Sequence, residues 1–203
     1  MIRLGTDSGE YDLLSRAAAS VMNMDGLSIE IGLREGGGSQ YMIEQLFEST
    51  MPDKIHVAID PYGSLPYEWQ EGKIAGWIYD DRMRNQALSS LYGLTSGTNV
   101  NFIFFNLTDD QFFKRFSDGI PVFTKGKEVL INEYSLVHLD AVHSVAAINK
   151  QVDFFAPRMK QNAIVVIDDI TEYYDTSKVE ENLFKHGFKV FEKGTKKGAY
   201  VKE

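Results

Sequence analysis

Short apolar runs alternate with segments of helical periodicity along this chain. Five compact runs rich in Val, Ile, Leu and Phe predict buried strands. These runs are residues 27–31, 55–59, 100–105, 136–139 and 163–167. Between them, apolar residues recur every three or four positions, which predicts amphipathic helices that lay one stripe on the sheet. The predicted helices cover residues 11–21, 42–47, 80–92, 109–116, 145–159 and 177–186.

The ends of these helices carry local signals. Acidic residues open the helix at 80–92 and Gly93 closes it. The helix at 145–159 is expected to end near Pro157. Ser177 and Glu180 have the spacing of a capping box for the last helix, which stops at Gly187.

Alternating strands and helices predict an α/β fold with a mostly parallel sheet covered on both faces. Two further β-like runs, residues 188–192 and 199–202, flank a Gly-Thr-Lys-Lys turn and predict a C-terminal antiparallel hairpin, which brings the sheet to seven strands. A chain of 203 residues is long enough for one substantial core, so we expect a single domain, residues 1–203.

Two insertions interrupt the alternation. Residues 61–79 carry Tyr62, Tyr67, Trp69, Trp77 and Tyr79 after the second strand. They form either a wall of the ligand site or a small satellite core, because insertions after the carboxyl ends of parallel strands lie where α/β sheets bind ligands. The insertion at 120–133 reads as a hairpin over 120–131, which we expect to be a structural flap or a contact in a homo-oligomer.

A glycine-rich turn follows the first predicted strand. The strand ends with Glu30, and the turn contains Gly32, Gly36, Gly37, Gly38 and Ser39. Glycines let the backbone turn sharply and approach a ligand without a Cβ in the way. The spacing does not match the G-x-G-x-x-G pattern of NAD-binding folds. The turn therefore predicts a different nucleotide-sized cofactor.

Acidic residues end the fourth and fifth strands. Asp140, followed by His143, comes after the fourth strand, and Asp168 and Asp169 come after the fifth. Neighbouring carboxylates repel one another unless a cation neutralises them, and hard ions such as Mg²⁺ prefer oxygen ligands. The three aspartates predict a metal site, although any one of them could instead cap a helix or bind loop amides.

Composition limits the partners. The net charge of −8 argues against general affinity for nucleic acid, and no apolar run is long enough to span a membrane. The absence of cysteine excludes disulfides and thiolate chemistry and fits a cytoplasmic setting.

Taken together, these motifs resemble class I S-adenosylmethionine (SAM) methyltransferases with a Rossmann-like fold, in particular the macrocin-type sugar O-methyltransferases and, more distantly, the catechol-type enzymes. The resemblance covers residues 27–170. It implies SAM contacts from the glycine turn, ribose contacts from the acid after the second strand, adenine contacts after the third strand, and a divalent metal at the aspartates. The implied cofactor residues are Glu30, Gly32, Arg34, Gly36, Gly37, Gly38, Ser39, Asp60, Asn106 and Asp140.

The predicted activity is metal-assisted O-methylation of a small hydroxylated molecule, such as a sugar or phenol, with Asp140 at the reacting centre. His143 is either the general base or a helix-end residue that only hydrogen-bonds its neighbours. His56, His138 and His186 are expected to be structural. Arg34 either contacts the SAM carboxylate or is an exposed loop residue.

Two alternatives stay open: an NAD(P)-linked oxidoreductase, and a SAM- or nucleotide-binding module without catalysis. The second draws support from Val142 and Val145, which stand where related enzymes carry an acid and an aromatic residue. Asn162-Ala163 replaces a Gly-Gly turn, and Asn tolerates the left-handed backbone that such a turn needs.

Overall fold

The computed structural model describes residues 3–6, 8–66, 68–70, 72–74, 79–124, 126–170 and 173–203. Its centre is a seven-stranded sheet with the strand order β10-β11-β9-β8-β1-β2-β5. The five strands from β9 to β5 in this order are parallel, and β11 runs antiparallel between β9 and β10. The strands of this sheet are β1 (Leu27–Ile31), β2 (Lys54–Ile59), β5 (Val100–Phe105), β8 (Tyr134–Leu139), β9 (Met159–Ile167), β10 (Phe188–Lys193) and β11 (Gly198–Lys202).

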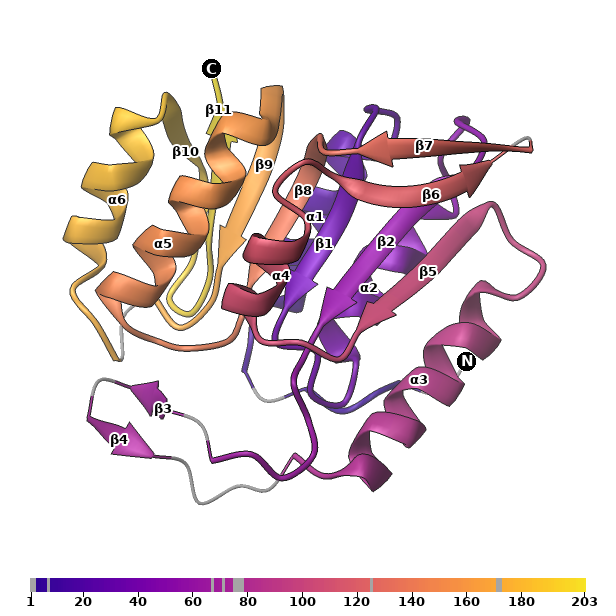
Figure 1. Cartoon of the computed structure of the whole chain (residues 1–203). Helices are drawn as coiled ribbons and strands as arrows, with labels where there is room; N and C mark the ends of the chain where they lie inside the picture. The colour runs from indigo at the N-terminus through magenta and orange to yellow at the C-terminus, as the bar shows by residue number, and fades with distance from the viewer. Residues whose placement is uncertain are drawn as a thin grey trace.

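Helices cover both faces of the sheet (Figure 1). On one face, α4, α5 and α6 bury a large apolar cluster against alternate residues of the central strands, such as Ile29 and Val57. On the other face, α1 packs on β8 and β9, whereas α2 and α3 pack toward β2 and β5. The helices are α1 (Tyr11–Val21), α2 (Gly37–Leu46), α3 (Asp81–Thr95), α4 (Asp109–Arg115), α5 (Val145–Phe155), followed by the short 3₁₀ helix η1 (Ala156–Arg158), and α6 (Thr176–Lys185).

The predicted fold class is confirmed, including the C-terminal hairpin. The chain moves outward from β1 to β5 and then crosses back to β8 on the other side of β1. This reversal creates a crevice at the carboxyl ends of β1 and β8, which is the usual ligand position in open parallel sheets.

The predicted C-terminal ends of two helices are wrong. α3 continues through Gly93 to Thr95, because Leu91 and Thr95 are buried and their packing offsets the cost of about 1 kcal/mol for a helical glycine. Met159 begins β9 rather than extending α5, since the chain turns at Pro157.

The left-handed backbone expected at Asn162 is confirmed, because its φ is 69°.

The predicted capping box of the last helix is also wrong. The N-cap of α6 is Asp175, whose carboxylate accepts a hydrogen bond from the backbone N–H of Ser177. Glu180 instead turns toward the hairpin and accepts a hydrogen bond from the Tyr200 hydroxyl at 2.8 Å. Gly187 follows the helix with φ of 79°, so the predicted stop is confirmed.

Both insertions contain small hairpins. The hairpin predicted at 120–131 is confirmed as β6 (Ile120–Thr124) paired with β7 (Lys127–Ile131). The insertion at 61–79 contains β3 (Glu68–Gln70) and β4 (Lys73–Ile74). Tyr67 and Trp77, which belong to the predicted aromatic wall, lie outside the described residues. None of the helices in the described part of the chain is long and apolar enough to cross a membrane.

The two ends of the chain are joined by Glu10. Its carboxylate accepts hydrogen bonds of 2.8–2.9 Å from the backbone N–H groups of Thr195, Lys196 and Lys197, in the turn between β10 and β11. Burial acts to raise the pKa of Glu10, but these donors lower it from 4.5 to about 2. The ionised carboxylate thus fixes the N-terminal segment to the C-terminal hairpin.

We expect Glu10→Gln to lower the melting temperature by about 2–4 °C at neutral pH. Because the folded-state pKa is depressed, this contribution is present above pH 4.5 and is lost as the pH falls toward 2. Thermal unfolding should therefore show the difference between Glu10→Gln and wild type shrinking between pH 5 and 2. Glu181→Gln, on the exposed side of α6, serves as the control; a difference independent of pH would contradict the assignment.

Candidate active site

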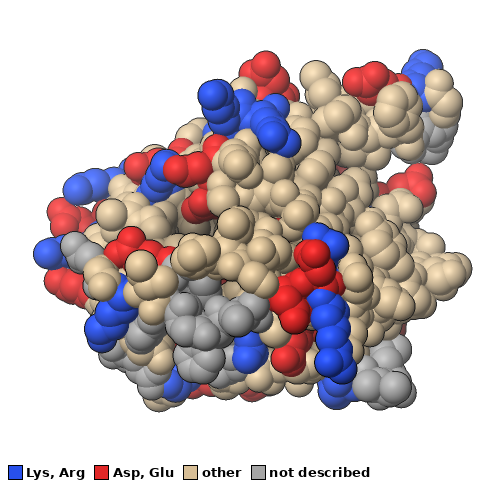
Figure 2. All heavy atoms as spheres, turned by 60° about the horizontal axis from the view of Figure 1, so that its bottom comes forward, with Lys and Arg blue, Asp and Glu red and all other residues tan. Residues whose placement is uncertain are grey.

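The site lies where the carboxyl ends of the central strands meet, at the lower edge of the sheet in Figure 1. Figure 2 turns this edge toward the viewer. Among the described residues in this view, basic and acidic side chains are interspersed around a largely uncharged surface. Neither acidic nor basic side chains therefore predominate on this surface, and the charges in the site come from individual residues.

The glycine turn between β1 and α2 lets three chain segments come together. A Cβ on Gly32, whose φ is 93°, would stand 2.0 Å from the backbone oxygen of Asp140. A Cβ on Gly38 would stand 1.9 Å from Oε1 of Glu30. A Cβ on Gly37 would meet the backbone oxygen of Gly5 at 2.4 Å. Glycine is thus required where β1 meets β8, where α2 meets β1, and where the N-terminal segment crosses the turn.

Glu30 is buried at the end of β1 and is the centre of a polar network. Its Oε2 accepts a hydrogen bond of 2.5 Å from the Ser39 hydroxyl, and its Oε1 lies 2.8 Å from Nδ1 of His138. Ser39 also contacts Nε2 of His56 at 2.8 Å, and Nδ1 of His56 contacts Ser28 at 2.5 Å. The network joins β1, β2, β8 and α2 beneath the crevice.

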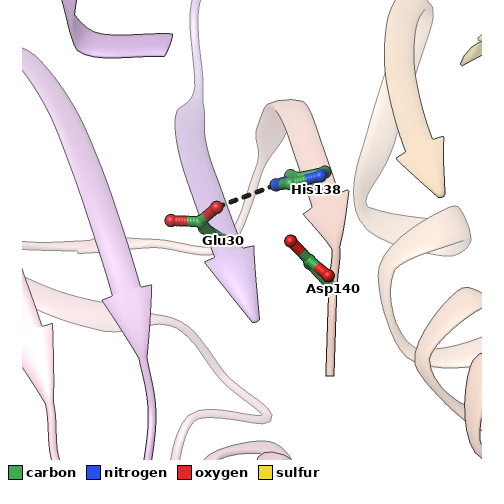
Figure 3. Close-up of side chains that lie close together, drawn as sticks. All are labelled: Glu30, His138 and Asp140. Carbon is green, nitrogen blue, oxygen red and sulfur yellow. Dashed lines mark hydrogen bonds and ion pairs between the residues drawn. The ribbon is translucent and has the colours of Figure 1, made fainter. Parts of the chain in front are cut away.

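The two histidines of this network are fully buried, as expected for structural residues, and they also form hydrogen bonds. Burial, together with the nearby His138, lowers the pKa of His56 to about 3, so its imidazole is neutral. A neutral ring can donate from Nε2 to Ser39 and accept at Nδ1 from Ser28. Figure 3 shows His138 beside Glu30, with Asp140 at the end of the same strand. Nε2 of His138 is buried and has no hydrogen-bond partner among the described atoms.

A pocket of about 150 Å³ opens beside this network. Asp60, at the end of β2, lies in its wall, and its carboxylate accepts hydrogen bonds from the backbone N–H groups of Arg34 at 2.9 Å and Tyr62 at 3.1 Å. Burial raises the pKa of Asp60, although these donors oppose the shift. The rest of the wall is largely apolar and includes Ile31, Ile59, Leu65, Tyr79, Leu107 and Val142.

Two other predicted cofactor residues shape this pocket. Arg34 has a left-handed backbone, with φ of 47°, and its carbonyl accepts a hydrogen bond from the Tyr62 hydroxyl. The amide nitrogen of Asn106, in the orientation that satisfies its neighbours, donates to the carbonyls of Asp60 and Pro61 at 3.0 and 3.1 Å. Both residues hold the loop after β2 in place.

Asp140, Asp168 and Asp169, the predicted metal ligands, are not among the sets of potential ligand atoms that lie within 4.8 Å of one another in the described part of the chain. Asp168 is buried, and its Oδ2 is held by the ammonium of Lys197 and, at 2.8 Å, by the Ser8 hydroxyl. Burial acts to raise the pKa of Asp168, but the charges of Lys197 and His138, together with the hydrogen bonds from Lys197 and Ser8, outweigh it, so the pKa lies below its usual value. Lys197 therefore already neutralises the most buried of the three carboxylates.

A different acidic group does come together. Within the described residues, Glu30, His138 and Asp140 are the set of three potential ligands whose atoms lie within 4.8 Å of one another. Each oxygen of Glu30 already accepts one hydrogen bond, so part of its accepting capacity is used within the network.

His143 and Asp169 form a second pair above the crevice. Nε2 of His143 lies 3.5 Å from Oδ2 of Asp169, and both side chains are mostly buried. The β3–β4 hairpin covers them: Gln70 forms an isolated β-bridge with His143 and donates from Nε2 to the carbonyl of Tyr173 at 2.9 Å. The Tyr173 ring lies 5.5 Å from that of His143. Gln70 and Tyr173 thus bring the β3–β4 hairpin and the segment after β9 against His143.

Sequence reasoning missed several residues of the site. The contact between His138 and Glu30 was not predicted, because His138 lies among hydrophobic residues. The pairing of Glu30 and His138 on adjacent parallel strands could have indicated it. Gln70 and Lys197 carried no local signal, since their partners are 103 and 29 residues away.

Comparison with known proteins supports the fold assignment. No protein-family model matches the sequence, and no curated protein does so at a significant level. The O-methyltransferase NovP is similar in structure, with a TM-score of 0.58 and 13% identity over 95% of this chain and 78% of its own. TomG from Streptomyces achromogenes, an O-methyltransferase of tomaymycin synthesis solved with SAM, has a TM-score of 0.56 and 15% identity over 98% and 82% of the two chains.

A third similar structure has a different methylation chemistry. It is the precorrin-6y C5,15-methyltransferase from Geobacter metallireducens, with a TM-score of 0.56 and 14% identity over 100% of this chain and 94% of its own. These similarities and the sheet order show that the chain has the Rossmann-like fold of class I SAM-dependent methyltransferases.

Proposed function

We propose that this protein is a SAM-dependent methyltransferase that acts on a hydroxyl group of a small molecule. The observation that carries this proposal is the pocket at the carboxyl ends of β1 and β2, whose largely apolar wall contains Asp60, Asp109 and Asp140, with Glu30 next to Asp140. SAM has matching parts, namely a nucleoside with two hydroxyls and a positively charged amino acid.

The pocket supports a position for each part of SAM. Asp60 would bind the ribose hydroxyls, and Leu107 and Val142 would contact the adenine ring. Glu30 and Asp140 would lie toward the cationic end of SAM, where carboxylates are favourable. Gly32, at the start of the glycine turn, lines the pocket, and the methionine portion would lie beside it. When bound, SAM supplies an electrophilic methyl group on a sulfonium.

The paired His143 and Asp169 support a hydroxyl acceptor. An ordinary hydroxyl is too weakly acidic to ionise at neutral pH, so a base must take its proton as oxygen attacks the methyl group. In our proposal His143 takes this proton while Asp169 orients the imidazole and stabilises its charged form. The acceptor oxygen gains the methyl group, and the sulfonium becomes a neutral thioether, S-adenosylhomocysteine (SAH).

The sequence-based prediction of metal assistance is not part of this proposal, because Lys197 holds Asp168. The similarity to a C5,15-methyltransferase leaves a carbon acceptor as an alternative outcome, but the His143–Asp169 pair favours an acidic proton on oxygen. A nicotinamide dinucleotide would need space for a second nucleoside beyond the single pocket described above.

Calorimetry with SAH and NADH tests the cofactor. We expect SAH to bind and NADH not to bind. Asp60→Asn should weaken SAH binding by about 10- to 100-fold, since a hydrogen bond to a charged acceptor contributes about 1.5–3 kcal/mol. Asp118→Asn, at an exposed position after α4, should leave the affinity unchanged.

Tight NADH binding without an SAH signal would reject the proposal in favour of an oxidoreductase. SAH binding without methylation of any hydroxylated acceptor, tested with a panel of sugars and phenols, would instead indicate a cofactor-binding module without this activity.

A further inference from the structure

Lys197 is fully buried, although lysine is among the residues least often found without solvent contact. It lies in the turn between β10 and β11 and reaches under the end of β9. Its ammonium donates to Oδ2 of Asp168 and, at 2.7 Å, to the Ser8 hydroxyl, which in turn donates to the same carboxylate oxygen. It also lies 4.3 Å from the centre of the Tyr11 ring.

These contacts satisfy both charged groups. The second oxygen of Asp168, Oδ1, accepts the backbone N–H of Asp169 at 2.8 Å. A buried charge without a partner is costly, whereas a pair with further hydrogen bonds is tolerated. The Tyr11 ring adds a favourable cation–π contact to the ammonium.

The backbone around Lys197 is fixed independently of this ion pair. Glu10 accepts the backbone N–H of Lys197 at 2.9 Å, and the carbonyl of Lys196 accepts the N–H of Ile170 at 3.0 Å. A Cβ on Gly194 would stand 2.0 Å from the Glu10 carboxylate, so the turn approaches Glu10 closely. The backbone that carries the Lys197 side chain is therefore held by contacts with the N-terminal segment and with the segment after β9.

We propose that Lys197 is the resident cation of this active site and replaces a divalent metal ion as the partner of the strand-end acid Asp168. The ammonium neutralises Asp168 and leaves Asp169 to orient His143. A divalent ion at the same acid would have to displace a hydrogen-bonded ammonium and would then lie beside another positive charge. Lys197 is thus a positioning residue, and the site works without metal.

Metal binding by the wild-type protein is the first test. Electron paramagnetic resonance of added Mn²⁺ should show no stoichiometric binding, and Mg²⁺, Mn²⁺ or EDTA should leave the melting temperature unchanged. A bound Mn²⁺ that is lost in Asp168→Asn would overturn the proposal.

Charge-removing variants are the second test. Lys197→Met should lower the melting temperature by several degrees because it leaves Asp168 buried and unpaired. The double variant Asp168→Asn/Lys197→Met, which removes both charges, should recover much of that loss. Lys189→Met, at an exposed position on β10, is the matched control and should behave as wild type.

Lys197→Met should also acquire a response that wild type lacks: Mn²⁺ should raise its melting temperature, because the carboxylate is then available. If Lys197→Met is as stable as wild type, or if the double variant is no more stable than the single one, the ion pair is not the reason for burying Lys197. Should the single variant not fold, the Mn²⁺ measurement on wild type and the stability of the double variant still decide the question. All these readouts are separate from SAH binding, so the proposed methyltransferase function can fail or hold independently.

Discussion

His143→Gln is expected to lower kcat by about 100-fold or more on a confirmed hydroxyl acceptor, with SAH affinity unchanged. Glutamine keeps hydrogen-bonding capacity at a similar size but cannot accept a proton under these conditions. A helix-end residue that only hydrogen-bonds its neighbours would be partly replaced by glutamine, whereas a general base would not. The effect should fall on kcat because His143 lies above the crevice rather than in the nucleoside pocket.

The pH dependence of kcat is an independent test of His143 as the general base. Protonated imidazole cannot act as a base, so the wild-type rate should fall on the acidic side and this limb should disappear in His143→Gln. His186→Gln is a suitable control, since His186 pairs with Asp153 on the surface, away from the site. Near-wild-type kcat in His143→Gln would show that another group receives the proton.

Gly32→Ala is expected to destabilise the protein by about 3 kcal/mol or more and to abolish SAH binding. Two effects combine at this position: the backbone has φ of 93°, and the added Cβ would overlap the backbone oxygen of Asp140 at 2.0 Å. Backbone atoms cannot move aside as a flexible side chain can, so β1 and β8 would have to separate at the crevice.

Gly97→Ala separates these two effects. Gly97 also has a positive φ, of 76°, but a Cβ there meets nothing within 4 Å. Its replacement should cost only about 1–2 kcal/mol, the penalty of a left-handed non-glycine residue. Denaturant unfolding of both variants measures the difference. Equal losses would mean that backbone conformation, and not the close approach to Asp140, makes Gly32 necessary.

The order of elements was accessible from the sequence because each element carries its own periodic signal. β1 and β5 have the predicted bounds, and the two hairpins lie where turn residues separate β-like runs. Helix ends were less predictable, as α3 shows: Gly93 is a local stop signal, but the burial of Thr95 is a tertiary effect that overrides it. Local helix propensity therefore sets the end of a helix only where tertiary packing does not.

The candidate cofactor residues were accessible for a similar reason. Glu30, the glycines and Asp60 follow strands whose directions the alternation already predicts, so their side chains were expected at one edge of the sheet. The structure places them there, and it adds the distances that make glycine necessary at Gly32 and Gly38. Their roles in binding SAM remain predictions.

What the sequence by itself determined is the α/β class, the parallel sheet with its terminal hairpin, and the edge at which polar strand ends gather, because these depend on local periodicity and chain direction. Only the tertiary structure decided which acids share that edge with which cations. Asp168 and Lys197 meet because β11 returns antiparallel beside β9, and no local pattern encodes that pairing. An aspartate at a strand end looks the same in the sequence whether a metal ion or a lysine neutralises it. Only long-range packing determines which of the two is its partner.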